Sequence, residues 1–420
     1  MTENQPTVRL KYLTEIDPPK SEVSNLPPDT EVSFIPLDAF GTNGNIEQYE
    51  SKPLEEVYGG YTYFQEGDIA IAKITPSFQN GKGAICEGLK NKIGFGTTEL
   101  YIIRPKKDTS TKFLWYSLRA KPFIDGGVAS MRGVAGQQRV TSEFLKNYEI
   151  IDISPARQQR IATFLDHHTA YIDALINKNQ QLLELLNEKR MSTIEKLLKQ
   201  AETGEYVKLK YVIDSLPGYS FSSDEFSSNS EDIRLLRGIN VGVGEVRWDE
   251  TAYWPNELAE DFEKYRLKPD DIVLGLDRPW ISNGIRIAQL DESDCPSLLV
   301  QRVLRIRSKP EILQKYILLN LSSERFRQYF EPITTGVSVP HISNKQVGEF
   351  EIPLPTESCQ SSIISRWEIF SQRMHRLEDL IERSIDLLQE KRQSLITAAV
   401  TGQIDVSDWE PPTEEAEVPV

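Results

Sequence analysis

An internal repeat inside two long helical segments constrains the fold of this chain more than any other feature. The hexapeptide LLNEKR at residues 185–190 returns as LLQEKR at residues 387–392, 202 positions later. Around each copy, apolar residues recur in steps of mostly three and four, which is the spacing of a coiled-coil seam. A helix over residues 157–199 would be roughly 60 Å long at 1.5 Å per residue and cannot bury such a seam alone. Its twin is the natural partner, so we predict an antiparallel coiled coil.

The predicted seam takes apolar residues at steps of three, four or seven along each helix. It consists of Ile161, Leu165, Ile172, Leu175, Leu182 and Leu186 in the first helix, and of Ile363, Trp367, Phe370, Met374, Leu377, Ile381 and Leu388 in the second. The alternative is that each helix packs only on its own neighbouring globular domain.

The repeat extends beyond the helices, because VRLKYL at residues 8–13 returns as VKLKYV at residues 207–212. Collinear matches over this length indicate two homologous halves. We predict an α+β protein of two halves related by a pseudo-two-fold axis, each with a mixed α/β globular domain followed by a long helix. The predicted boundaries are residues 1–155 and 204–355 for the domains, 156–203 and 356–402 for the helices, and 403–420 for a disordered acidic tail.

Composition limits the environment and the partners. The three cysteines of this 420-residue chain are scattered without a CxxC pair, which is typical of a reducing compartment. There is no apolar run of membrane length and no signal-peptide core, so we expect a cytoplasmic protein. The net charge of −15 opposes general binding to DNA. Any DNA contact must therefore be local, and other faces should meet protein.

No catalytic motif rises above background. A phosphate-binding GxxxxGK loop and a metal-binding HExxH are both absent, and the four histidines lack ligand spacing with the cysteines. The DPPK of residues 17–20 is similar to the core of amino-methyltransferases, but it lacks the aromatic residue that stacks on a flipped base. We therefore expect no catalytic residue, no metal and no cofactor in this chain.

One loop in each half carries side chains of the types that can contact DNA bases. Arg and Lys can bond guanine, Asn and Gln suit adenine, and exposed backbone and hydroxyls can hold phosphates. The candidates are Lys73, Thr75, Gln79, Asn80 and Lys82 in the first half, and Arg278, Trp280, Asn283 and Arg286 in the second. A tight loop with ordinary solvated charges is the alternative. Two domains with the same scaffold but different loop residues would suit the recognition of two different DNA sequences.

A second polar, glycine-containing region precedes each long helix, where it could contact phosphates. Its candidates are Arg132, Gln137, Gln138 and Arg139 in the first half, and Ser338, His341 and Lys345 in the second. A purely structural turn is equally consistent with these residues. Arg237 and Asn240, at the end of a predicted strand, are further candidates.

Together, the loop from Lys73 to Lys82, the turn at residues 340–343 (PHIS) and the twin helices resemble a type I restriction–modification specificity subunit over nearly the whole chain. The resemblance implies a non-catalytic subunit that reads a bipartite, asymmetric double-stranded DNA target. It also implies that two modification (methyltransferase) subunits dock on the coiled coil, that a restriction subunit completes the complex, and that S-adenosylmethionine, ATP and Mg belong to these partners. The alternatives are a fused or self-contained methyltransferase or nuclease, and a coiled-coil scaffold that does not read DNA.

Overall fold

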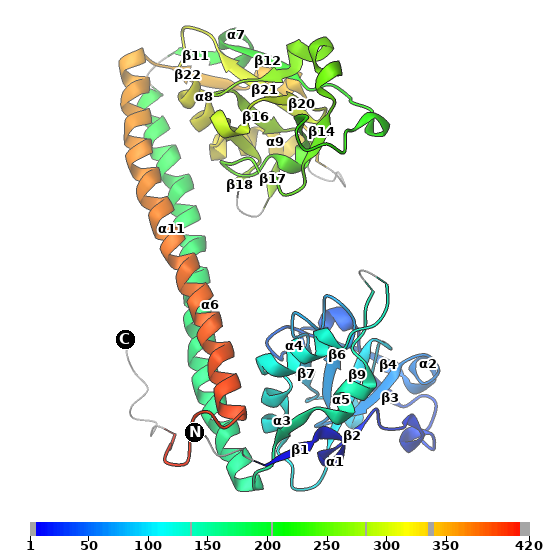
Figure 1. Ribbon diagram of the computed structural model, residues 1–420. Coiled ribbons are helices and arrows are strands. Elements are labelled where there is room, and N and C mark those ends of the chain that lie inside the picture. Colours follow the sequence, from blue (N-terminus) through cyan, green and yellow to red (C-terminus); the bar gives the residue numbers. More distant parts are fainter. Residues whose placement is uncertain (1–5, 135–136, 203–204, 282–283, 335–339, 412–420) are drawn as a thin grey trace. The chain divides into compact units, whose positions relative to one another are not determined.

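The computed structural model describes residues 6–134, 137–202, 205–281, 284–334 and 340–411. The chain divides into two compact units, residues 1–179 with 383–420 (unit 1) and residues 180–382 (unit 2). Each unit contains one globular domain and parts of the two long helices, α6 (Pro155–Leu198) and α11 (Glu357–Val400) (Figure 1). Pro155 suits the first turn of α6, because its missing N–H would have no helical partner there.

The globular domain of unit 1 is built on two four-stranded sheets. Their strand orders are β2-β9-β6-β7 and β4-β3-β8-β5, and a third pair, β1-β10, joins the start of the domain to the strand before α6. The strands are β1 (Thr7–Arg9), β2 (Thr14–Ile16), β3 (Glu31–Ile35), β4 (Glu50–Pro53), β5 (Thr62–Gln65), β6 (Ile69–Ala72), β7 (Gly83–Ile85), β8 (Ile93–Gly96), β9 (Leu100–Pro105) and β10 (Glu149–Ile151). The helices are α1 (Leu10–Leu13), α2 (Leu54–Val57), α3 (Thr111–Ser117), α4 (Lys121–Ala129) and α5 (Ser142–Asn147).

Unit 2 repeats this topology strand for strand. Its sheets have the orders β12-β21-β16-β19 and β14-β13-β20-β15, with β11-β22 as the third pair. The strands are β11 (Glu205–Lys208), β12 (Ile213–Pro217), β13 (Ile233–Leu236), β14 (Ala252–Trp254), β15 (Arg266–Leu267), β16 (Ile272–Gly275), β19 (Ile287–Gln289), β20 (Ser297–Leu299), β21 (Val303–Ser308) and β22 (Glu351–Leu354). The helices are α7 (Leu209–Val212), α8 (Gln314–Leu321), α9 (Glu324–Thr334) and α10 (Asn344–Glu349), and the unit adds a hairpin, β17 (Trp280–Ile281) with β18 (Gly284–Ile285).

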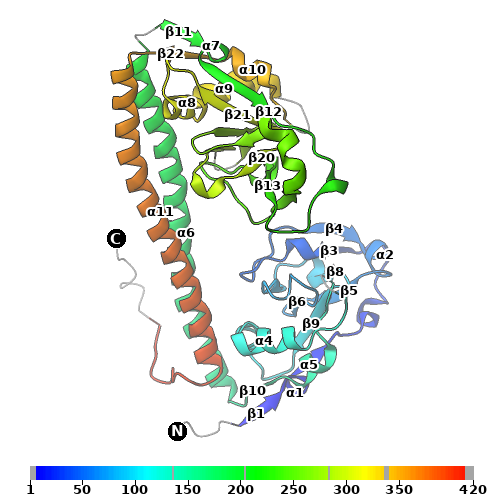
Figure 2. The same ribbon diagram turned by 45° about the horizontal axis from the view of Figure 1, so that its top comes forward.

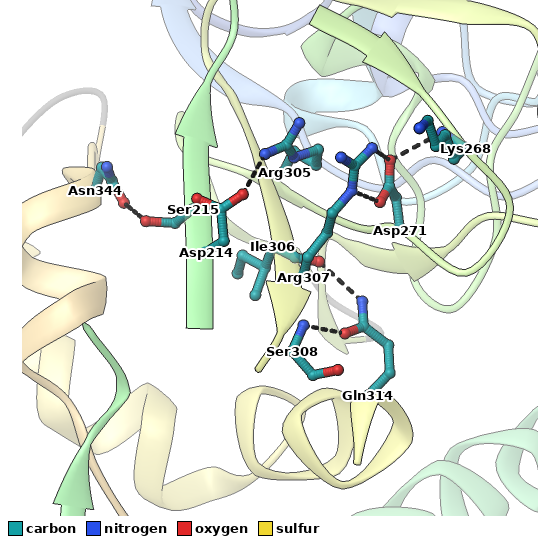
Figure 3. A network of polar contacts seen from close by, with 10 residues as sticks. All are labelled: Asp214, Ser215, Lys268, Asp271, Arg305, Ile306, Arg307, Ser308, Gln314 and Asn344. Carbon is teal, nitrogen blue, oxygen red and sulfur yellow. Dashed lines mark hydrogen bonds and ion pairs between the residues drawn. The ribbon is translucent and has the colours of Figure 1, made fainter. Parts of the chain in front are cut away.

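The same buried ion pair fastens the central sheet in both units. In unit 1, the guanidinium of Arg104 lies 2.8 Å from the buried carboxylate of Asp68. In unit 2, Arg307 on β21 pairs with the buried Asp271, which also accepts the backbone N–H of Lys268 (Figure 3). The repeat therefore reaches individual side chains.

The long helices pair in antiparallel fashion within each unit (Figures 1 and 2). In unit 1, Arg392 bonds Asp173 at 2.8 Å and Ser384 accepts from Asn179 at 3.1 Å. In unit 2, Arg190 bonds Glu378 at 2.6 Å and Arg366 bonds Gln200 at 2.7 Å. Residue numbers on α6 rise along the pair as those on α11 fall, which confirms the predicted antiparallel coiled coil.

Most of the predicted seam residues lie in this contact. Ile161, Leu165, Ile172 and Ile363 are buried, and Leu175, Leu186, Trp367, Phe370, Met374, Ile381 and Leu388 are half-buried. Two predictions are wrong, because Leu182 is 47% exposed and Leu377 is 43% exposed. The half-buried neighbours Leu183 and Glu378 take their places, the latter through its ion pair with Arg190.

The predicted disordered tail is wrong for residues 403–411, which fold against unit 1. Val406 is 5% exposed, and the ring of Trp409 lies 5.3 Å from that of Phe164. The apolar side chains among the acidic residues, including Ile404, make this packing favourable. Residues 412–420 lie outside the described residues. Across the described ranges, no helix combines the length and apolar character needed to cross a membrane.

Candidate nucleic-acid interface

In unit 1, the two predicted polar regions lie side by side. The loop that follows β6 pairs with the segment before α5: Thr75 donates its backbone N–H to the carbonyl oxygen of Gln138 at 2.9 Å, and Val140 donates to that of Lys73 at 2.9 Å. Ile74 and Arg139 form a bridge between them. Two regions more than 60 residues apart in sequence thus form one surface. The spacing of residues in the sequence does not reveal that they lie together.

Unit 2 builds the same arrangement after β16. Arg278 donates its backbone N–H to the carbonyl oxygen of Pro340 at 2.7 Å, and Ile342 donates to that of Leu276 at 2.9 Å. Asp277 bridges His341. Each half therefore presents one loop pair, held at the end of a buried central strand.

The first loop of unit 1 is a compact turn held to the domain core by the buried side chain of Phe78. Phe78 donates its N–H to the Ile74 carbonyl at 2.9 Å and Asn80 to the Pro76 carbonyl at 3.0 Å. The Phe78 ring is buried against Gly127, where an added Cβ would lie 2.3 Å from it. The anchor leaves the side chains of its neighbours, Gln79 and Asn80, exposed at the surface.

The corresponding loop of unit 2 is the hairpin β17–β18. Its anchor is Trp280, whose ring centroid lies 6.3 Å from that of Phe326 and 5.8 Å from that of Phe330. Trp280 is therefore half-buried packing and not a free base-stacking group. Arg278 is exposed and has a φ of 43°, and the exposed Ile281 ends β17. Asn283 and Ser338 lie outside the described residues.

Three cations beside the loops already have partners. Arg139 lies 2.8 Å from Glu99, and its hydrogen bond lowers the pKa of that carboxyl group. Lys82 lies 3.8 Å from Asp38. The Lys73 amine lies 5.2 Å from the ring of Tyr101.

Two candidates have structural roles instead. Asn240 is 1% exposed: its amide oxygen accepts the Arg237 N–H at 3.0 Å and its amide nitrogen donates to the Arg247 carbonyl at 2.8 Å. The prediction that it contacts DNA is therefore wrong, because a buried amide with these bonds has no edge left for a base. Arg286 is half-buried and donates to the carbonyl oxygens of Val241 and Asp277 at 3.0 and 3.2 Å. Burial lowers the pKa of its guanidinium.

Other predicted residues remain at the surface with polar atoms available. Gln79, Asn80, Arg132, Gln137, Arg278 and Lys345 are exposed. His341 is exposed as well, with Nδ1 2.5 Å from the Asp277 carboxylate. Arg237 is half-buried and donates to the Glu250 carbonyl at 2.6 Å, and Gln138 and Thr75 are half-buried in the loop pairing.

Sequence reasoning missed three residues of these surfaces. Arg119 donates to the Gly81 carbonyl at 2.8 Å and supports the first loop from the turn between α3 and α4. Arg302 is exposed with Nη1 3.2 Å from the Asp277 carboxylate, and Ile281 offers an apolar contact. Nothing in the local sequence marks Arg119, or Arg302, which lies between β20 and β21. Within the described ranges, no group of three or more His, Cys, Asp or Glu residues could hold a metal ion.

These features define a class of protein: a duplicated chain with one polar loop pair per half and a two-helix coiled coil. The sequence matches the family model described as type I restriction modification DNA specificity domain over residues 6–185. The EcoAI specificity subunit of Escherichia coli is 29% identical, with 93% of this chain and 81% of that protein covered. The MjaVIII specificity subunit of Methanocaldococcus jannaschii is 28% identical, with 70% and 71% covered.

A solved structure shares the fold. That structure is described as the structural basis underlying complex assembly and conformational transition of the type I R-M system. Its TM-score is 0.66 at 17% identity, and the match covers 96% of this chain and 100% of that one. This chain belongs to the family of type I restriction–modification specificity subunits. It is accordingly the DNA-specificity component, and catalysis lies in partner subunits.

Proposed function

We propose that each globular domain reads one half of a bipartite, asymmetric DNA target through its loop pair. The observation that carries this proposal is the contrast between matched scaffolds and unmatched loops. Both domains have the same strand order, yet one presents a compact turn with Gln79 and Asn80 and the other a hairpin with Arg278 and Ile281. Amide groups suit adenine, a guanidinium suits guanine, and an aliphatic side chain suits the thymine methyl group.

The charge distribution supports local contact with DNA. The chain carries a net charge of −15, so its surface as a whole repels phosphates. Arg132 and Arg278 are exposed next to the loop pairs, and no ion pair to either occurs among the described residues. A few such cations can hold phosphates while neighbouring side chains read base edges.

Exposed apolar side chains on the long helices support docking of partner proteins. They are Leu182, Leu185, Ile369, Leu377 and Leu380 in unit 2, and Tyr171 and Leu387 in unit 1. Apolar patches on a helix surface mark interaction sites, since burial of their area is favourable. We propose that two modification subunits dock here and that a restriction subunit completes the complex. S-adenosylmethionine, ATP and Mg would belong to these partners, and the assembly would act in the cytoplasm.

The coiled coil would set the distance between the two half-targets. Domains that enter major grooves on one side of DNA must match the helical repeat of about 34 Å per turn. Helix length would then determine the number of unread base pairs between the half-targets, and the loops would determine the bases that are read.

A map of methylated sites tests this proposal. The DNA would come from cells that carry this chain with its modification subunit, and DNA from cells with the modification subunit alone is the control. We expect two different short half-targets separated by a fixed gap of unread bases. A single undivided palindrome, or methylation that does not depend on this chain, would contradict the proposal.

A further inference from the structure

The segment that follows α11 folds back onto the start of α6 within unit 1. This C-terminal segment (Gln403–Pro411) carries Trp409, whose ring centroid lies 5.3 Å from that of Phe164. The same ring lies 5.8 Å from His167 and 5.9 Å from His168. One face of α6 is therefore covered by the chain itself.

The segment is fastened at several points along its length. Gln403 donates its backbone N–H to the Ala398 carbonyl at 2.9 Å, Val406 is buried, and the guanidinium of Arg160 donates to the Ser407 carbonyl. The hydrogen bonds from Ser407, and after them the charges of Arg157 and Arg160, lower the pKa of Asp405. An apolar ring flanked by carboxylates thus sits on a helix face with apolar rings and cations.

The twin of this face is open in unit 2. The offset of 202 places His167 and His168 on Ile369 and Phe370 of α11. Ile369 is 56% exposed. In the described part of the chain, the ring that contacts Phe370 belongs to Trp367 on the same helix, 5.7 Å away.

The open face has the chemistry to receive a segment of the same kind. Leu380 lies 11 residues after Ile369, which at 3.6 residues per turn places it within about 20° of the same line along the helix. Leu380 is exposed, as are the cations Arg373 and Arg376 between them. An apolar side chain flanked by carboxylates would bury this stripe and neutralise these charges. The stripe is also continuous with the helix surface proposed above for the modification subunits.

We propose that the C-terminal segment occupies in unit 1 the helix face that a modification subunit occupies in unit 2. This inference rests on the proposed docking of two modification subunits. The first copy binds at Ile369, where the face is free. The second copy must displace Trp409, so the two copies bind with unequal affinity although their sites are repeats of each other.

Titration of the full chain with the modification subunit of its own system tests this inference. Native mass spectrometry counts the bound copies, and calorimetry measures both affinities. For the unchanged chain we expect a complex with one bound copy at intermediate ratios. Trp409→Ala should strengthen binding of the second copy by about tenfold, the effect on a binding constant of removing one competing aromatic cluster.

Two further variants make the result specific. Ile369→Asp should abolish the strong first step and leave Trp409 in place. Gln403→Ala is the matched control, because the Gln403 side chain is exposed in the same segment and carries no charge, so its loss should leave both steps unchanged. Equal affinities in the unchanged chain would overturn the inference. So would a Trp409→Ala chain that binds the second copy no better. Absence of any bound copy would instead overturn the docking proposal on which the inference rests.

Discussion

The two loop pairs differ in the part that faces outward, while the strands beneath them correspond one to one. In unit 1, Phe78 anchors a compact turn from below, and in unit 2 Trp280 anchors a hairpin. Both loops are held by the same backbone pairing to the segment that leads toward the long helix. The difference teaches that the shared strands fix where each loop lies, and that the two halves differ in the residues that the loop exposes.

The matched parts extend to the junction between each domain and its helix. Gln158 accepts the Ser110 N–H at 2.9 Å and donates to the Ile153 carbonyl at 3.1 Å. Its twin Gln360 accepts the Leu313 N–H at 2.8 Å and donates to the Pro355 carbonyl at 3.0 Å. Both side chains are buried. Identical bonds at both junctions indicate that each domain is held to its helix in the same way.

Loss of the buried ion pair that occurs in both units should lower the free energy of unfolding most, and by the same amount in each half. Asp68→Ala and Asp271→Ala each remove the buried carboxylate from a partly buried guanidinium, which costs about 3 kcal/mol of the free energy of unfolding. Arg104 keeps a second carboxylate, that of Glu22 at 2.8 Å, so Asp68→Ala is measured in a Glu22→Ala background. Chemical denaturation measures this cost. As a control, Asp38→Ala removes only a long, exposed contact to Lys82 and should change little. A large loss in only one half would break the correspondence between the scaffolds.

Loss of a reading side chain should affect one half-target only. Arg278→Ala should relax the sequence specificity at one half-target. If the guanidinium makes two hydrogen bonds to one base, the loss costs roughly 1–3 kcal/mol of DNA-binding free energy. Asn80→Ala should relax the other half-target. Methylation maps of both variants measure this. A uniform weakening across all sites would show that Arg278 contacts phosphate instead.

Loss of a junction glutamine should have a smaller effect. Gln158→Leu or Gln360→Leu leaves a backbone N–H and a carbonyl without their partner and should cost about 1–2 kcal/mol of stability. Thermal unfolding measures it, with the exposed Gln181→Leu as a control on the same helix. If only one junction is sensitive, the two domains are held to their helices differently.

Protonation of His168, which lies in unit 1, should have the smallest effect on stability. Burial, followed by the charges of His167 and Lys391, lowers the pKa of His168. A folded-state pKa below the unfolded value of about 6.5 means that stability is present above that pH and falls as the pH drops through it. We expect a decrease of about 1 °C in melting temperature from this group. His168→Phe, which copies the twin Phe370, should remove that part of the pH dependence, and an unchanged pH profile would contradict the assignment.

The sequence predicted the duplication and the helix pairing, because both depend on patterns that repeat along the chain. It could not choose between Leu182 and Leu183, or between Leu377 and Glu378, because neighbouring residues both border a seam of helical period. The ion pair of Glu378 with Arg190 decides the second case, and it becomes visible only when the partner helix is in place. Asn240 was misassigned for a similar reason: its amide looks available until the carbonyl groups that accept from it are known.

In the proposed function, the loops read bases and the long helices set the gap between the half-targets. One added heptad in each long helix, placed at twin positions, keeps the seam and lengthens the coiled coil by about 10 Å. The methylation map should then show the same two half-targets with a gap longer by about 3 base pairs, at about 34 Å per helical turn. An unchanged gap, or new bases in either half-target, would contradict the account.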